Sequence, residues 1–353
     1  MSKPFTRIGF VNQVRNFEAA FNSPYFGKWG SKIGFERAVT KDILQKLDLE
    51  SQYEDPSNEL NIVDHNTGFN SFTYELNQHL MPRMHLILPE NATLQKFWTN
   101  VKNHDPKCSS MYLLDADPKS IRHFDTEALV NNGTLSLRKE TEHEVNQTLL
   151  LTGSYLQASE KPKVRSMLYF NQMSLSWFKY QRVKSLFWLR PKDCIKYLGL
   201  MGTRFRQTNS VVAAAFNDIN MIACSNSAKS KTVEMAMEQY KDVIRLPNVP
   251  GQEDLVLVEF QSNHDKHSIY SLPDFTLVVH KLFMIPSSTL SNNLHFLGPG
   301  ADEYFHEVLP RNMLKTKVYS LAVKDLVFVA NMFYRWPFKP NTDLELYLES
   351  DKS

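Results

Sequence analysis

Two turns after apolar runs carry the polar residues best placed for chemistry, and the first follows Leu60–Val63. This run ends in Asp64, and Gly68 lies four residues further on. A nucleotide-type ligand needs glycine in such a turn, because the backbone must approach it closely. Only one glycine is present, since the next candidate position is Asn70. An ordinary strand-to-helix turn explains the same residues, and the spacing alone favours that interpretation.

The second turn, Thr152 to Tyr155, follows the apolar run Thr148–Leu151. An enzyme that methylates an exocyclic adenine amine needs side-chain acceptors for the N–H groups and an aromatic ring for stacking. This turn offers hydroxyl groups and the ring of Tyr155, but it has no Asn or Asp. The sequence therefore favours a plain turn over a catalytic one.

The strongest physical signal is a stretch without acidic residues from Lys161 to Lys192, in which basic and aromatic side chains alternate. Basic side chains pair with phosphates, and aromatic rings stack on unpaired bases. From this stretch and the basic residues after it we predict phosphate contacts at Lys179, Arg182, Lys184, Arg204 and Arg206, and stacking at Trp177 and Tyr180. A core helix with inward aromatics and solvated lysines explains the stretch equally well, and both interpretations can hold.

Strands and helices alternate over the first two thirds of the chain. The expected strands are 60–63, 84–88, 111–114, 148–151, 210–216, 220–224 and 255–260. The expected helices include 69–80, 91–101 and a long one at 170–187. This alternation predicts an α/β fold, with a parallel sheet and helices on both faces. Ligands of such sheets bind beyond the carboxyl ends of the strands, where Asp64, Asp117 and Thr152 would lie.

The pattern changes near Ser271, after which only helices are expected, at 274–284, 301–309 and 323–334. Prolines punctuate this region. We therefore expect an α/β domain over residues 1–270, a small helical domain over 271–340 and an acidic tail over 341–353.

Composition limits the classes of function. The net charge of the 353 residues is only +2, so a nucleic-acid role must rest on a local patch. The three cysteines lie far apart, which excludes zinc-ligand spacing and fits a reducing compartment. No run approaches the ~20 apolar residues of a membrane span. The first acidic residue is Glu18, preceded by three basic residues, which is compatible with mitochondrial import and with many cytosolic N-termini.

The segment Phe333-Tyr334-Arg335-Trp336-Pro337-Phe338-Lys339-Pro340 closely resembles the C-terminal end of the yeast-type mitochondrial transcription factor B family. Weaker matches in the same order span nearly the whole chain: Lys46–Leu49, Val183–Trp188, Ser210–Phe216 and Leu257–Glu259. That family resembles the rRNA adenine N6-dimethyltransferases, which have a Rossmann-like methyltransferase domain and a small helical C-terminal domain.

The resemblance implies partners and a task. The partners would be the mitochondrial RNA polymerase and the non-template strand of promoter DNA in the mitochondrial matrix, with RNA as a further ligand. The task would be promoter melting, with the tail near the template strand. An S-adenosylmethionine-dependent rRNA adenine dimethyltransferase is the alternative.

Carried onto this chain, the resemblance implies S-adenosylmethionine contacts at Gly34, Asp64, Gly68, Glu90, Asp117 and Thr152. The chain departs from the family pattern at several of these positions. Gly34 replaces a large apolar residue, Asn70 replaces the second glycine of the turn, and the ribose-binding acid falls at Pro89 or Glu90. The catalytic Asn-Pro-Pro-Tyr motif corresponds to Thr152-Gly153-Ser154-Tyr155, and losing its Asn and Pro argues against base methylation. An aromatic pair that reads the open strand in yeast relatives corresponds to Lys119 and Ile121.

Overall fold

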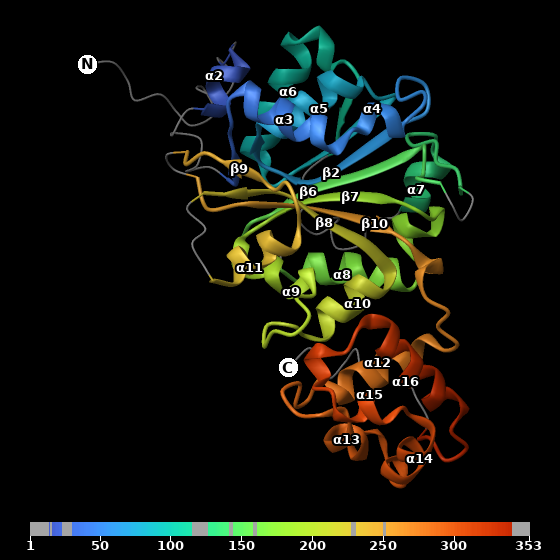
Figure 1. Ribbon diagram of the computed structural model, residues 1–353. Coiled ribbons are helices and arrows are strands. Elements are labelled where there is room, and N and C mark those ends of the chain that lie inside the picture. Colours follow the sequence, from blue (N-terminus) through green and yellow to red (C-terminus); the bar gives the residue numbers. More distant parts are fainter. Residues whose placement is uncertain are drawn as a thin grey trace. The chain divides into compact units, whose positions relative to one another are not determined.

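The computed structural model describes residues 14, 16–22, 30–114, 126–140, 144–157, 161–226, 231–249 and 252–340 (Figure 1). The chain divides into two compact units. The first comprises Met1–Cys194 and Asp218–Ser262, and the second comprises Ile195–Asn217 and Asn263–Ser353.

The described residues of the first unit form an eight-stranded sheet in the order β5-β4-β2-β6-β7-β10-β8-β9. Six strands coincide with expected ones to within a few residues: β2 (Asn61–Thr67), β4 (Met84–Pro89), β5 (Met111–Leu113), β6 (Leu149–Tyr155), β8 (Asn217–Ser225) and β10 (Val256–Ser262). The others are β7 (Lys184–Leu189) and β9 (Ile244–Leu246). Neighbours from β5 to β7 are parallel, whereas β10 runs antiparallel to β7 and departs from the predicted parallel pattern.

Helices cover both faces of this sheet, which confirms the predicted α/β fold (Figure 1). On one face lie α3 (Arg37–Leu47), α5 (Ser71–Leu80) and α6 (Ala92–His104), and on the other lies α8 (Lys161–Gln172). All seven residues of β6 are buried, as expected for a central strand covered on both sides. A short strand β1 (Lys32–Ile33) pairs with β3 (Phe69–Asn70) outside the main sheet.

The predicted helix 170–187 is wrong. Helix α8 ends at Gln172, a 3₁₀ turn follows at Ser176–Tyr180, and the chain then enters strand β7. Four residues between α8 and β7 have positive φ: Ser174, Ser176, Gln181 and Arg182. Left-handed backbone cannot continue a right-handed helix, so these residues turn the chain into the sheet.

The predicted strand 210–216 is also wrong, because it forms helix α10 (Thr208–Phe216). Three consecutive alanines, Ala213 to Ala215, favour a helix. Val211, Ala215 and Phe216 belong to the hydrophobic core of the second unit.

The second unit is helical over its described residues. Besides α10 it contains α12 (Leu272–Leu282), α13 (Leu290–Asn293), α14 (Ala301–Val308), α15 (Arg311–Lys315) and α16 (Val323–Arg335). Helices α12 and α16 pack against each other over a core that includes Phe275 and Phe333. No helix in the described part of either unit combines the length and hydrophobicity that crossing a membrane requires.

Candidate functional site

The carboxyl edge of the first unit's sheet brings two predicted cofactor-binding residues together. In the strand register Asp64 on β2 lies beside Thr152 on β6 and beside Ile87 on β4. The side chains of Asp64 and Thr152 are both fully buried. The predicted third member, Asp117, lies outside the described residues.

The carboxylate of Asp64 is only partly satisfied. Its Oδ2 accepts a short hydrogen bond from Thr73 Oγ1, and its main-chain oxygen accepts one from Thr67 Oγ1 at 2.9 Å. Its Oδ1 has no hydrogen-bond partner among the described residues. Burial raises the pKa of Asp64 to about 7, although the hydroxyl of Thr73 opposes the shift. This carboxyl group therefore carries its proton up to near neutral pH.

A second buried titratable group, His85 on β4, lies next to Asp64, and the sequence analysis did not identify it. Its Nε2 is 3.9 Å from Asp64 Oδ2. The amide nitrogen of Asn77 lies 3.1 Å from Nδ1, so Nδ1 accepts and the ring proton lies on Nε2, facing Asp64. Burial lowers the pKa of His85 to about 3, so the ring is neutral. A histidine inside an apolar strand was the signal that could have revealed it.

The two predicted cofactor glycines, Gly68 and Gly34, are in close contact with the chain itself. A Cβ atom on Gly68 would lie 2.2 Å from the main-chain oxygen of Ser31, and one on Gly34 would lie 2.1 Å from that of Phe21. Ser31 O also accepts a hydrogen bond from Phe69 N at 2.8 Å. The close approach that requires glycine is thus to the residue before β1 in the case of Gly68, and to helix α2 (Phe17–Asn22) in the case of Gly34.

Glu90, the predicted ribose-binding acid, is also engaged by the chain. Its Oε2 accepts hydrogen bonds from Ser31 N at 2.9 Å and from Gln157 Nε2 at 3.2 Å. Burial raises the pKa of Glu90. Its Oε1 is buried and has no partner among the described residues, which leaves one acceptor for a ligand hydroxyl.

At the start of α5, Asn70 occupies the position of the family's second glycine. Its Oδ1 accepts hydrogen bonds from Phe72 N and Thr73 N, which caps the helix, and its Nδ2 donates to Ser154 Oγ at 3.4 Å. Thr152 Oγ1, in contrast, has no partner among the described residues. A capping side chain thus takes the helix N-terminus that a ligand would otherwise use.

Taken together, the described residues do not fit S-adenosylmethionine. Glu90 keeps one acceptor, but the glycine turn is covered by Ser31 and the helix N-terminus by Asn70. Asp64 points its carboxylate toward Thr73 inside the protein. Two acceptors on this side of the sheet, Glu90 Oε2 and Asn70 Oδ1, are therefore used by the chain's own backbone N–H groups.

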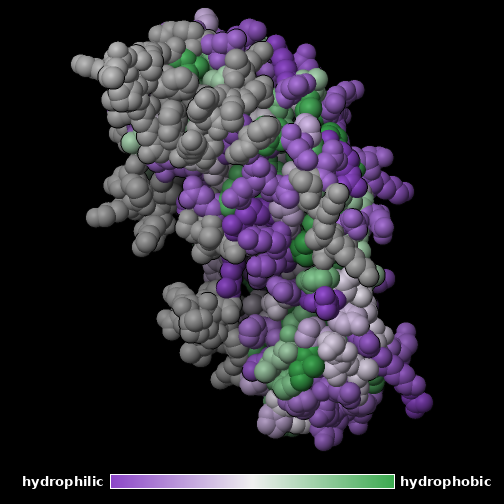
Figure 2. All heavy atoms as spheres, turned by 90° about the vertical axis from the view of Figure 1, so that its left-hand side faces the viewer, coloured by the Kyte–Doolittle hydropathy of each residue, from purple (hydrophilic) through white to green (hydrophobic). Residues whose placement is uncertain are grey.

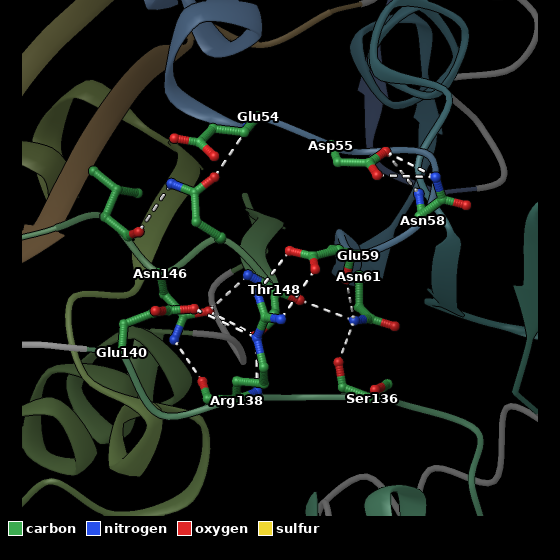
Figure 3. Close-up of polar contacts among 12 residues, drawn as sticks. Glu54, Asp55, Asn58, Glu59, Asn61, Ser136, Arg138, Glu140, Asn146 and Thr148 are labelled. Carbon is green, nitrogen blue, oxygen red and sulfur yellow. Dashed lines mark hydrogen bonds and ion pairs between the residues drawn. The ribbon is translucent and has the colours of Figure 1, made fainter.

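The amino-terminal edge of the same sheet carries a network of hydrogen-bonded polar side chains (Figure 3). Asn61 Nδ2 donates to the main-chain oxygens of Glu59, Ser136 and Thr148. Thr148 Oγ1 donates to Asn146 Oδ1 at 2.9 Å and accepts from the main-chain nitrogen of Arg138 at 3.0 Å. Arg138 forms a two-pronged ion pair with Glu59.

Two of the predicted nucleic-acid contacts in the first unit are buried. Trp177 is 1% exposed, and its ring packs edge-on at 6.1 Å from the ring of His65. Lys184 lies in β7 and pairs with Glu259 on β10. Lys184 therefore drops out of the predicted phosphate-binding set, and Trp177 out of the stacking set, because neither presents its functional group to solvent.

The other predicted residues of the first unit lie nearer the surface. Lys179 Nζ is 2.9 Å from Glu127 Oε1 and 5.3 Å from the ring centre of Tyr180. The hydrogen bond with Glu127 raises the pKa of Lys179. Tyr180 and Arg182 are half-buried, and their main-chain oxygens are held by Asn146. The backbone is thus fixed at this position, and the cation of Lys179 lies beside the ring of Tyr180.

In the second unit the two predicted arginines differ. Arg206 is buried, and its Nη1 donates to the main-chain oxygens of Tyr319 and Leu321. Burial lowers its pKa to about 10, so it stays charged near neutral pH. Arg204 is exposed and lies over the ring of Phe205 at 5.1 Å. Arg206 therefore holds the helical unit together, and only Arg204 is exposed to solvent.

Metal chemistry finds no support in the part of the chain that the structure describes, where no three His, Cys, Asp or Glu side chains cluster as ligands. The cysteines at 108, 194 and 224 are free and buried.

Mitochondrial transcription factor 1 of Saccharomyces cerevisiae is 22% identical over 349 residues, covering 97% of this chain and 96% of that protein. Mitochondrial transcription factor 1 of Lachancea kluyveri is 23% identical over 323 residues, covering 89% of this chain and 91% of that protein. The crystal structure of the 23S rRNA methyltransferase ErmE shares the fold, with a TM-score of 0.51 at 10% identity over 84% of this chain and 97% of that one.

A family model described as ribosomal RNA adenine dimethylase matches residues 27–330, which include both the sheet and most of the helical unit. The chain therefore belongs to the ribosomal RNA adenine dimethylase family.

Proposed function

We propose that this protein is a mitochondrial transcription initiation factor of the mitochondrial matrix. It binds the mitochondrial RNA polymerase, promotes promoter melting and holds the opened non-template strand. The names of the relatives that match nearly the whole chain support this role. The alternative is an rRNA adenine N6-dimethyltransferase, which the family supports.

The tip of β6 is the observation that supports the first role over the second. An adenine amine would have to meet hydrogen-bond acceptors and an aromatic face there. Instead, all residues from Thr152 to Tyr155 are buried, and Tyr155 packs edge-on against Phe187 at 5.1 Å. Neither an amide acceptor nor an open ring face is presented at this tip. The fold is retained while the reacting geometry is lost, which favours binding over methylation.

A strand-holding role needs cations and rings at the surface. Lys179, Tyr180 and Arg182 provide them in the first unit, and Arg204 provides a further cation in the second. The ion pair of Lys179 does not prevent phosphate binding, because Glu127 is 72% exposed and such pairs are weak in water. Stacking contributes ~1–3 kcal/mol per base, and opening duplex DNA costs ~1.4 kcal/mol per step. A few captured bases therefore offset much of the cost of opening a short start site.

Promoter opening is the direct test of this function. A 2-aminopurine placed in the non-template strand at a mitochondrial start site reports unstacking as increased fluorescence. With the cognate polymerase present, we expect the increase only when this protein is added. No increase on linear or negatively supercoiled DNA, together with radiolabelled methyl transfer to small-subunit rRNA, would establish the alternative.

The binding surface is tested by a double variant, Lys179→Ala with Arg182→Ala. Removing two phosphate contacts should flatten the slope of log affinity against log salt by about 1.4 for single-stranded DNA. Lys41→Ala with Lys241→Ala removes two exposed lysines outside the predicted surface and is the matched control. Equal slopes for the two double variants would exclude Lys179 and Arg182 from the interface.

A further inference from the structure

In the helical unit, the segment after α16 is anchored at both ends. Trp336 is 3% exposed, and its ring stacks on that of Tyr304 at 5.8 Å with an angle of 19° between the planes. Four residues later, Pro340 packs against Gly298, where a Cβ atom would lie 3.3 Å from the proline ring. The residues between these two anchors are therefore held in place.

Large aromatic side chains on and beside this anchored segment face solvent. Phe338 is 80% exposed, Tyr334 is 48% exposed and Tyr270 is 50% exposed. Figure 2 shows hydrophobic side chains intermixed with hydrophilic ones at the surface of this unit, in the lower part of the view. Leaving a phenylalanine exposed forgoes ~1.5–3 kcal/mol of burial energy, and exposed apolar side chains that group together mark interaction sites.

Cations lie over two of these rings. The guanidinium of Arg335 is 5.1 Å from the ring centre of Tyr270 and donates to its hydroxyl at 3.1 Å. Lys339 Nζ lies 5.0 Å from the ring centre of Tyr334. The rings of Tyr270 and Tyr334 meet edge-on at 6.0 Å. We call these four residues together with Phe338 the aromatic–cation surface.

The charge around this surface favours an anionic partner. Lys324 and Phe328 are exposed on α16 at helical spacing from Arg335, which extends the surface along the helix. Lys339 pairs with Asp274, a buried carboxylate that neutralises part of the positive charge. Lys324 and Arg335 leave the surface positive, as a phosphate backbone requires.

We infer that the aromatic–cation surface is a second binding site for single-stranded nucleic acid, in which a base stacks on Phe338 and Arg335 contacts the adjoining phosphate. Alternating rings and cations are the pattern by which proteins hold single strands without reading their sequence. The inference rests on the proposed function, because it requires that the protein bind an opened strand. It adds a stacking site in the helical unit to the cations proposed above.

The experiment measures the affinity of the full chain for a single-stranded oligonucleotide that contains 2-aminopurine. Anisotropy of a terminal dye gives affinity, and quenching of the 2-aminopurine gives stacking. We expect Phe338→Ala to weaken binding by about 5- to 150-fold, the equivalent of ~1–3 kcal/mol per stacked base, and to relieve the quenching. Phe338→Trp should preserve both signals, whereas Phe338→Leu, which keeps an apolar side chain without a ring, should lose both. Met284→Ala is the control, since Met284 is 56% exposed in the same unit and outside the surface.

Each outcome has a distinct meaning. Unchanged affinity and quenching in both Phe338→Ala and Tyr334→Ala would overturn the inference, and a loss in Lys179→Ala with Arg182→Ala would then leave the proposed function standing. Loss of promoter opening with the polymerase, but not of single-strand binding, in Phe338→Ala would assign the surface to a protein partner and also overturn it. A wild-type chain that does not bind the oligonucleotide would refute the strand-holding function itself.

Discussion

The two edges of the first unit's sheet differ in whether their buried polar groups have hydrogen-bond partners. At the amino edge Asn61, Asn146 and Thr148 form a network whose groups donate and accept hydrogen bonds within the chain (Figure 3). At the carboxyl edge Asp64 Oδ1 and Thr152 Oγ1 are buried with no partner among the described residues. Strands β2 and β6 connect the two edges, so the same sheet carries both arrangements.

This difference distinguishes buried polar groups that stabilise the fold from buried polar groups that remain at a ligand-binding edge. A buried polar group without a partner costs about 1–3 kcal/mol, so selection for stability alone would remove such groups. Some of them lie at the edge where α/β sheets bind their ligands. The carboxyl edge thus contains buried polar groups that stability does not explain.

The largest expected effect is at Asp64. Its pKa is about 7 in the folded protein against an ordinary value of 3.8. Between these values the folded protein holds a proton that the unfolded chain has lost, so stability falls as the pH rises from about 4 through about 7. Over this pH range the free energy of unfolding falls by up to about 4 kcal/mol. Asp64→Asn should remove this pH-dependent loss and raise the free energy of unfolding above pH 7, as measured by urea denaturation over a pH series.

The neighbouring histidine also changes stability with pH, so its contribution must be subtracted in this test. Since the pKa of His85 is lowered, its contribution to stability is lost as the pH falls below its ordinary value of 6.5. The comparison is therefore the difference between Asp64→Asn and wild type at each pH, in which the contribution of His85 largely cancels. A difference that stays flat from pH 4 to pH 8 would mean that Asp64 is ionised throughout.

Thr148→Val at the amino edge should have a smaller and opposite effect. The substitution keeps the shape of the side chain but removes a hydroxyl that serves both Asn146 and the main chain of Arg138. Leaving those groups unpaired should lower the free energy of unfolding by about 1–3 kcal/mol. Denaturant midpoints at constant pH measure this, and an unchanged midpoint would contradict the importance of the network.

Thr152→Val, four residues along the same chain segment, should have the smallest effect. The hydroxyl of Thr152 has no partner among the described residues, and both threonines are buried. Its removal should change the free energy of unfolding by less than about 1 kcal/mol, in the stabilising direction. If Thr152→Val lowered the free energy of unfolding as much as Thr148→Val, the polar groups at both edges would contribute equally to stability.

The sequence predicts the sheet best where apolar runs are bounded by polar turns, as at β2, β4 and β6. It fails over 170–187 because positive φ values at Ser174, Ser176, Gln181 and Arg182 involve no glycine or proline that would mark them. The apolar run Leu186 to Leu189 then suits a helix as well as a strand. The Val-Val-Ala-Ala-Ala run in α10 is ambiguous for the same reason.

The candidate site was predictable in position but not in its contacts. Placing Asp64 and Thr152 at one edge follows from the parallel topology. That Ser31 covers Gly68 and engages Glu90 depends on a contact between residues 59 positions apart, which no local pattern encodes. The burial of Lys184 likewise depends on Glu259, which lies on a strand late in the chain.

The ring of Trp336 makes the helical unit optically distinct. It is the only tryptophan of the sequence in the ranges 195–217 and 263–353. If the four tryptophans of the first unit were replaced by phenylalanine, emission from this single indole would follow the melting of the helical unit alone. The separate unfolding transitions of the two units could then be read in the intact chain.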